Sequence, residues 1–110
     1  MCSARLWLSV RLIMVDLDIS PAARADLVGI RKYSIEQFSA KVADAYYLGF
    51  DEVFALLRSH PLAGQAHPEL SKDLRCIVHR KHRIFYTVNG DTAVIIRIIH
   101  RARDAQSTLN

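Results

Sequence analysis

The chain has 110 residues and a mass of 12.5 kDa, enough for one small domain with a single hydrophobic core. Hydrophobic residues make up 51% and charged residues 24% of the chain, a composition that excludes disordered, collagen-like and coiled-coil proteins. No apolar run approaches the roughly 18 residues that a membrane span requires.

The net charge of +4 is concentrated in the second half of the chain. Residues 1–55 carry six Lys and Arg against seven Asp and Glu, whereas residues 56–110 carry nine against four and all five histidines. This polarity indicates an acidic partner, either nucleic acid or an acidic protein segment, unless the basic face is simply solvated. The two cysteines, Cys2 and Cys76, are too few for a disulfide scaffold, so we expect a reduced, cytoplasmic protein.

The N-terminal segment, residues 1–13, lacks the long apolar core and the small-residue cleavage site of a signal peptide. We interpret it as an extension, with Met14 as an alternative start, and residues 14–110 as the single domain. Alternating residues after Met14 predict a first strand, in which Val15, Leu17 and Ile19 face away from Asp16, Asp18 and Ser20.

Ser20-Pro21 predicts the start of a helix, because serine caps free backbone N–H groups and proline at the first helical position has none to satisfy. A break near Phe38-Ser39 separates this helix from a second one at residues 40–59, which His60-Pro61 ends. The first helix has apolar spacing at Ala23, Leu27, Ile30 and Ser34. The predicted apolar stripe of the second is Val42, Ala45, Tyr46, Gly49, Val53, Leu56 and Leu57.

Gly49 within the second helix predicts a close helix–helix crossing in an antiparallel hairpin. Residues 61–72 are typical of a loop, and the apolar period then changes to two, which predicts strands at residues 74–80, 83–89 and 92–100. Asn89-Gly90 supplies a hairpin turn between the last two strands. The last strand is apolar on both faces and is predicted to be central. The order β-α-α-β-β-β predicts an α+β domain, with the helical hairpin packed on a twisted, mainly antiparallel sheet and a short C-terminal tail.

Arg97 lies among aliphatic residues of the last strand, so it either pairs with an internal Asp or Glu or emerges on an open sheet face. In the second case it would form a cationic face with Arg75 and Arg83. His100 at the end of the strand suits either a general acid/base or a packing role. No spacing of Cys and His matches a metal site, and no glycine-rich phosphate loop occurs, so we expect neither metal nor cofactor.

Two motifs are informative in combination. The pattern Ser-Pro-x-Ala-x-x-Asp-Leu occupies residues 20–27, and Arg-x-x-His-x-x-Arg-Asp occupies residues 97–104. Together with Pro68-Glu69-Leu70, Leu74-Arg75 and the segment at residues 83–86, they make the chain, from about Val15 to its C-terminus, resemble the ParE toxins of the RelE/ParE superfamily of type II toxin–antitoxin systems.

The resemblance implies a bacterial toxin with a role in plasmid stabilisation that inhibits DNA gyrase and replication without catalysis of its own. It implies neutralisation by a ParD-type antitoxin, whose acidic C-terminal segment folds on the basic toxin in a hetero-oligomer. For antitoxin binding it points to the helical hairpin around Tyr46, Phe50 and Phe54. The surface expected to inhibit the target comprises Arg75, Arg83, Arg97, His100, Arg101 and Arg103.

The alternative function is that of the ribosome-dependent mRNA endoribonucleases of the RelE type in the same superfamily. Glu69, Arg83 and His100 would then act as base, phosphate clamp and acid. Those nucleases carry a tyrosine next to or near this histidine, where Arg101 stands here, or a set of lysines earlier in the chain. A non-toxic binding module is the third reading.

Overall fold

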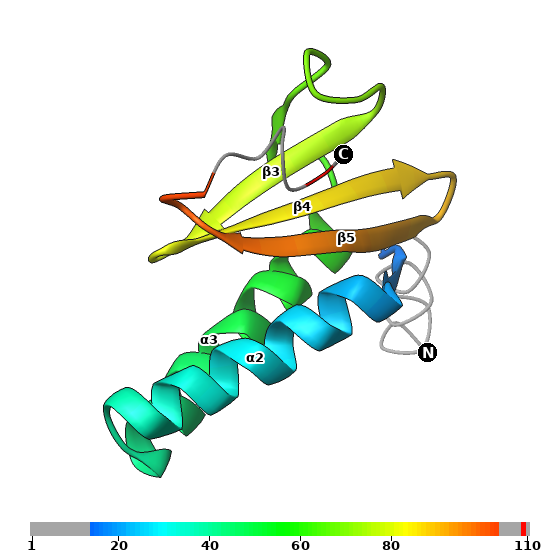
Figure 1. Cartoon of the computed structure of the whole chain (residues 1–110). Helices are drawn as coiled ribbons and strands as arrows, with labels where there is room; N and C mark the ends of the chain where they lie inside the picture. Colours follow the sequence, from blue (N-terminus) through cyan, green and yellow to red (C-terminus); the bar gives the residue numbers. More distant parts are fainter. Residues whose placement is uncertain (1–13, 104–108, 110) are drawn as a thin grey trace, which may run out of the picture.

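A computed structural model of the chain describes residues 14–103 and residue 109 (Figure 1). The N-terminal extension predicted at residues 1–13 therefore lies outside the described residues. The elements are β1 (Asp16–Ile19), α2 (Pro21–Gln37), α3 (Ala40–Ser59), β2 (Gln65–Ala66), β3 (Leu74–His79), β4 (His82–Asn89) and β5 (Thr92–His100).

The two helices begin where the sequence predicts. The Ser20 side chain accepts a hydrogen bond from the Ala23 N–H at 3.1 Å, and Pro21 occupies the first turn of α2. Ser39 caps α3 in the same way, accepting from the Val42 N–H at 3.1 Å. The helices form an antiparallel hairpin on one face of the sheet, and its tip extends beyond the sheet (Figure 1).

The sheet has the strand order β1-β5-β4-β3-β2. β1 runs parallel to β5, and the other neighbours are antiparallel, so the predicted α+β fold is confirmed. The last strand, predicted to be central, has a neighbour on both sides only from Thr92 to Ile95. The sequence did not predict β2, which has only two residues and pairs with β3. Gly90, with φ of +62°, makes the turn between β4 and β5, as Asn89-Gly90 predicts.

The main core lies between the hairpin and the sheet. Phe50, Leu57, Ile84, Tyr86 and Ile95 are fully buried there. A smaller apolar cluster on the opposite sheet face comprises Leu74, Cys76, Phe85 and Ile99. The two clusters explain why β4 and β5 carry apolar residues on both faces.

The predicted stripe of α3 is partly wrong. Val42 and Leu56 are 49% and 42% exposed, whereas Ala43 and Phe50 are buried. Because α3 carries apolar residues around most of its circumference, helical spacing alone fits more than one stripe, and packing against the sheet selects one of them.

Gly49 marks a close approach of the helix to a strand, not to the other helix. A Cβ atom at this position would lie 2.6 Å from Nε2 of His79 in β3. The predicted helix–helix crossing at Gly49 is therefore wrong, and the missing side chain makes room for the imidazole ring.

Candidate functional site

The second half of β5 has no strand on one of its two sides. β1 pairs only with the first half of β5, from Thr92 to Ile95. Beyond that point α2 supplies hydrogen-bonding groups instead: the Ser20 hydroxyl donates to the Ile96 carbonyl at 2.8 Å, and Asp26 accepts from the Ile98 N–H at 2.9 Å. Two polar side chains of α2 thus protect a strand edge that is otherwise open to pairing.

Arg97 forms a two-point ion pair with Asp26 across this edge. Its Nε and Nη2 donate to the two carboxylate oxygens at 2.8 and 3.0 Å. These hydrogen bonds raise the pKa of the Arg97 guanidinium above its ordinary value. Of the two alternatives that the sequence leaves open for Arg97, the structure shows the ion pair.

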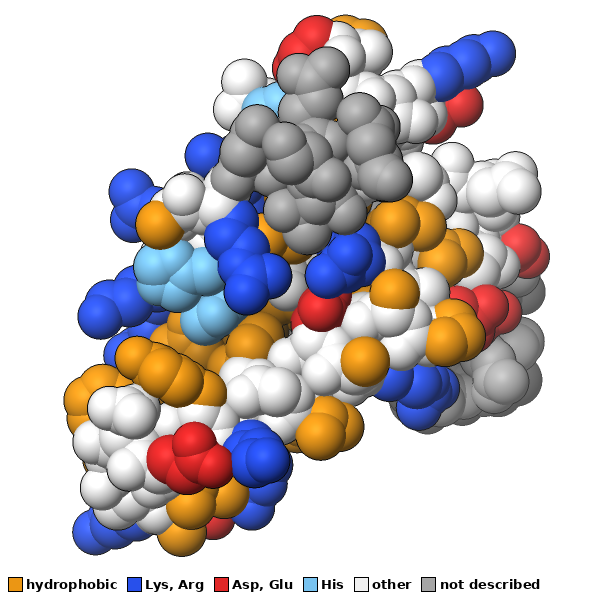
Figure 2. All heavy atoms as spheres, viewed as in Figure 1, with side chains coloured by type: hydrophobic (Ala, Val, Ile, Leu, Met, Phe, Trp, Pro, Cys, Tyr) orange, Lys and Arg blue, Asp and Glu red, His pale blue; other side chains and the backbone are white. Residues whose placement is uncertain are grey.

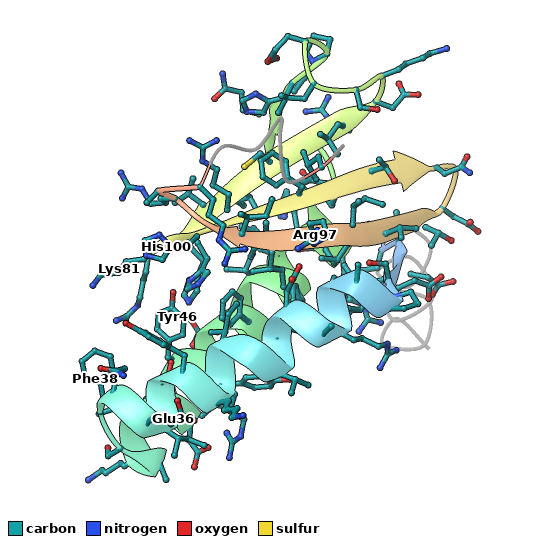
Figure 3. The ribbon with its side chains drawn as sticks, in the orientation of Figure 1. Glu36, Phe38, Tyr46, Lys81, Arg97 and His100 are labelled. Atoms are coloured by element: carbon teal, nitrogen blue, oxygen red, sulfur yellow. The ribbon has the colours of Figure 1, made fainter. Side chains whose placement is uncertain are left out.

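Three histidines and a tyrosine gather at the end of β5. The Tyr46 hydroxyl of α3 lies 2.6 Å from Nδ1 of His82. The rings of His82 and His100 meet edge to face at 5.4 Å, and the ring of His79 contacts those of Tyr46 and Phe50. Figure 3 shows Tyr46 and His100 near one another, with Lys81 beside them and Arg97 farther along β5.

The interior of this histidine cluster is held neutral. Burial first, and then the neighbouring His100 and His79, lower the pKa of His82 to about 4 against the opposing effect of Asp26. Burial and then Arg80 lower the pKa of His79 as well. Burial also raises the pKa of Tyr46, so its hydroxyl keeps its proton.

The low pKa of His82 predicts a loss of stability in mild acid. A histidine that binds its proton near pH 6.5 when unfolded, and only near pH 4 when folded, draws the equilibrium toward the unfolded chain as the pH falls between these values. We expect the free energy of unfolding, measured in urea, to be about 2 kcal/mol lower at pH 5 than at pH 7. His82→Gln should reduce this difference, and the control His60→Gln at an exposed position should retain it. An equal pH dependence in both variants would contradict the assignment.

A groove of about 600 Å³ runs between α2 and the end of β5. Among the residues that line it, Ala25, Gly29 and Ile30 belong to α2, and His82, His100 and Arg103 lie on the opposite side. Figure 2 shows the histidines over apolar surface at this place, with Lys and Arg side chains around them.

Four basic residues surround the end of β5. Arg101 and Arg103 follow β5, and Arg80 and Lys81 form the turn between β3 and β4; all four are exposed. The Arg101 N–H donates to the Lys81 carbonyl at 2.8 Å, which joins the two segments. We call these four residues and His100 the basic end of the sheet. The predicted target surface did not include Arg80 and Lys81, although two adjacent basic residues between His79 and His82 already indicated a basic turn.

The three arginines predicted to share a cationic face do not all lie on one face of the sheet. Arg75 lies on the face of β3 that Tyr86 occupies in β4, and its Nη1 donates to the Gly64 carbonyl at 2.7 Å. Arg83 pairs with Val78 on the opposite face of the sheet, and Arg97 is bound to Asp26. Of the predicted target residues, only His100, Arg101 and Arg103 lie together.

The residues of the alternative nuclease site are also separated. Glu69 lies in the loop before β3 and contacts Nδ1 of His67 at 3.2 Å. Arg83 of β4 and His100 of β5 lie beside the opposite end of β3. The two ends of β3 are roughly 20 Å apart, at about 3.3 Å per residue. Arg83 and His100 moreover face opposite sides of the sheet, because His82, the residue before Arg83, is the one that contacts His100.

The predicted antitoxin-binding aromatics do not form a surface groove. Phe50 is fully buried and Phe54 is 8% exposed, both within the main core, and Tyr46 is partly buried against His82. The three aromatic rings fill the space between α3 and the sheet. The exposed apolar side chains of the hairpin are others: Val28, Tyr33, Ile35, Phe38, Val42, Leu48 and Leu56.

The described residues offer neither a metal-binding cluster nor a membrane-spanning helix. Within the described part of the chain, no three His, Cys, Asp or Glu side chains are arranged to hold a metal ion. None of the helices described is both long and apolar enough to cross a bilayer.

Comparison with known proteins identifies relatives over most of the chain. The profile of the family described as ParE toxin of the type II toxin–antitoxin system parDE matches residues 17–105. Toxin ParE1 of Caulobacter vibrioides is 30% identical over 91 residues, covering 83% of this chain and 94% of that protein. Toxin ParE1 of Mycobacterium tuberculosis is 25% identical over 92 residues, with the same coverage of 83% and 94%.

Two solved structures share the fold. A chain of the chromosomal ParDE system of P. aeruginosa superposes with a TM-score of 0.69 at 21% identity, covering 79% of this chain and 96% of that one. A chain of the toxin–antitoxin complex RelBE2 of Mycobacterium tuberculosis gives a TM-score of 0.58 at 20% identity, covering 81% and 100%.

Proposed function

The chain belongs to the ParE toxin family of type II toxin–antitoxin systems, and we propose that it inhibits DNA gyrase until a ParD-type antitoxin neutralises it. In this proposal the toxin acts in the bacterial cytoplasm by binding its target, without catalysis. The separation of Glu69 from Arg83 and His100 favours this reading over mRNA cleavage.

The observation that carries the target proposal is the basic end of the sheet. Its four cations are exposed and stand on two segments joined by a backbone hydrogen bond, so their charges are held close together. Such a surface attracts an acidic protein segment or a DNA-bound enzyme. We therefore assign the gyrase contact to His100, Arg101 and Arg103, with Arg80 and Lys81 beside them. Arg75 and Arg97 hydrogen-bond within the fold, to the Gly64 carbonyl and to Asp26, and Arg83 lies outside this surface.

Two features support an antitoxin partner. The hairpin exposes seven large apolar side chains, Phe38 at 66% and Val28 at 68% among them, and such surfaces are typical of protein interfaces. The excess of basic residues in the second half of the chain complements an acidic antitoxin segment that folds on binding. The proposed assembly is accordingly a hetero-oligomer of toxin and antitoxin.

The test is a gyrase supercoiling assay that also scores linearised DNA from trapped cleavage complexes. Wild-type toxin is expected to inhibit supercoiling at micromolar concentration, and the antitoxin to reverse this. The Arg101→Ala/Arg103→Ala double variant should need about tenfold more protein, since two exposed charge contacts contribute on the order of 1.4 kcal/mol. Lys41→Ala/Lys72→Ala, which removes the same charge elsewhere, serves as the control.

Absence of inhibition by correctly folded wild-type toxin would overturn the gyrase proposal. Arrest of translation, in place of induction of the SOS response, on expression of the toxin alone would instead identify the ribosome as target. Equal effects of the two double variants would show that net charge, not the basic end of the sheet, governs inhibition.

A further inference from the structure

The ring of His100 presents a hydrogen-bond donor. Nδ1 of His100 accepts a hydrogen bond from the Ala102 N–H at 3.1 Å, which leaves the ring proton of the neutral imidazole on Nε2. The Tyr46 hydroxyl lies 2.6 Å from Nδ1 of His82, so this hydrogen bond engages Nδ1 and leaves Nε2 as the second polar atom of the ring.

Both rings and Arg103 line the groove between α2 and β5. Within the residues that the structure describes, Nε2 of His82 and Nε2 of His100 make no hydrogen bond. One side of the groove is thus lined by two imidazole rings and a guanidinium group, while Ala25 and Ile30 make its other side apolar. The Asp26 carboxylate also borders the groove, but Arg97 and the Ile98 N–H already bind it.

We propose that this groove binds an Asp or Glu side chain of the antitoxin, whose carboxylate contacts His82, His100 and Arg103 while a neighbouring apolar side chain packs on α2. This proposal rests on the proposed function and specifies which antitoxin side chain the groove binds. The donors suit an anion, and a charged hydrogen bond at such a site contributes more than a neutral one. The apolar wall and the 61%-exposed Tyr33 at its rim favour an amphipathic peptide over a nucleic-acid phosphate.

A bound carboxylate changes the protonation of His82, whose pKa burial holds low in the free toxin. A negative charge beside an imidazole favours its charged form, so binding is accompanied by proton uptake, and the affinity rises as the pH falls. Uptake of one proton increases the affinity by up to about tenfold per pH unit. The charged or titratable groups that face His82 and His100 from the surrounding elements are Asp26 of α2, Tyr46 of α3, His79 of β3, Arg80 of the following turn and Arg103.

The experiment is a calorimetric titration of the toxin with the purified protein encoded by the adjacent reading frame, at pH 7.5 and pH 6.0. Wild type is expected to bind more tightly at pH 6.0. His100→Gln and Arg103→Gln should each weaken binding at pH 7.5 by roughly tenfold, since loss of a charged hydrogen bond costs about 1.4 kcal/mol or more. Lys72→Gln, at an exposed position that does not line the groove, should retain the wild-type affinity.

The outcomes separate the two proposals. If wild-type toxin does not bind the adjacent-frame protein, the proposed function itself fails. If it binds, but folded His100→Gln and Arg103→Gln behave like Lys72→Gln, the groove is not the carboxylate site and only this inference is overturned. If these two variants lose affinity for a DNA duplex and not for the antitoxin, the groove takes a phosphate, which also overturns it.

Discussion

Replacing Asp26 with alanine is expected to lower the free energy of unfolding by about 3 kcal/mol, as urea denaturation at pH 7 would measure. The carboxylate accepts hydrogen bonds from Nε and Nη2 of Arg97 and from the Ile98 N–H. Its loss removes the carboxylate that a partly buried guanidinium binds at two points, and it leaves a strand N–H without its acceptor. Asp26→Asn retains one acceptor oxygen and should lose less stability.

The matched control is the ion pair between Arg31 and Asp44 on the surface of the hairpin. These side chains are 42% and 58% exposed, against 26% and 16% for Arg97 and Asp26. Asp44→Ala should therefore cost less than about 1 kcal/mol, because water and salt screen exposed pairs. Equal losses for Asp26→Ala and Asp44→Ala would contradict the structural role of Asp26 at the open edge of β5.

Replacing Phe50 with alanine is expected to cost about 3–5 kcal/mol, the range for removing a buried phenyl ring. Phe50 is fully buried and contacts the rings of Tyr46, Phe54 and His79. The cavity left behind would also loosen the packing of the histidine cluster. Thermal and urea unfolding of the purified variant would measure the loss.

Phe38→Ala provides the comparison for Phe50→Ala. Phe38 is 66% exposed at the end of α2, so its replacement should change stability by only about 0.5 kcal/mol. If the hairpin binds the antitoxin, Phe38→Ala should instead weaken that complex. The opposite pattern, a stable Phe50→Ala protein with impaired antitoxin binding, would restore the original assignment of Phe50 to the interface.

The proposed groove and the proposed target surface share two residues. His100 and Arg103 belong to the basic end of the sheet and also line the groove between α2 and β5. An antitoxin side chain held in the groove would therefore cover part of the gyrase contact. Neutralisation then follows from direct occupation of the surface, with no change in toxin conformation.

The sequence by itself determined the order of the elements other than β2 and most of their limits. Helix caps and tight turns act on backbone groups within a few residues of themselves, so they can be predicted without the rest of the chain. This applies to Ser20-Pro21, Ser39 and Asn89-Gly90. The motifs at residues 20–27 and 97–104 likewise carried the resemblance to ParE toxins, which the match of the family over residues 17–105 bears out.

Only the tertiary structure decided which side chains face which surface. Asp26 and Arg97 are 71 residues apart, and nothing local to either indicates that α2 borders the open edge of β5. The stripe of α3 depended on how the helix is rotated against the sheet, and so Phe50 is a core residue. Arg75 and Arg83 were separated by the alternation of side chains along the strands and by strand register. The groove at His82, His100 and Arg103 arises where a helix, two strands and the segment after β5 meet, so its geometry depends on the packing of segments distant in the sequence.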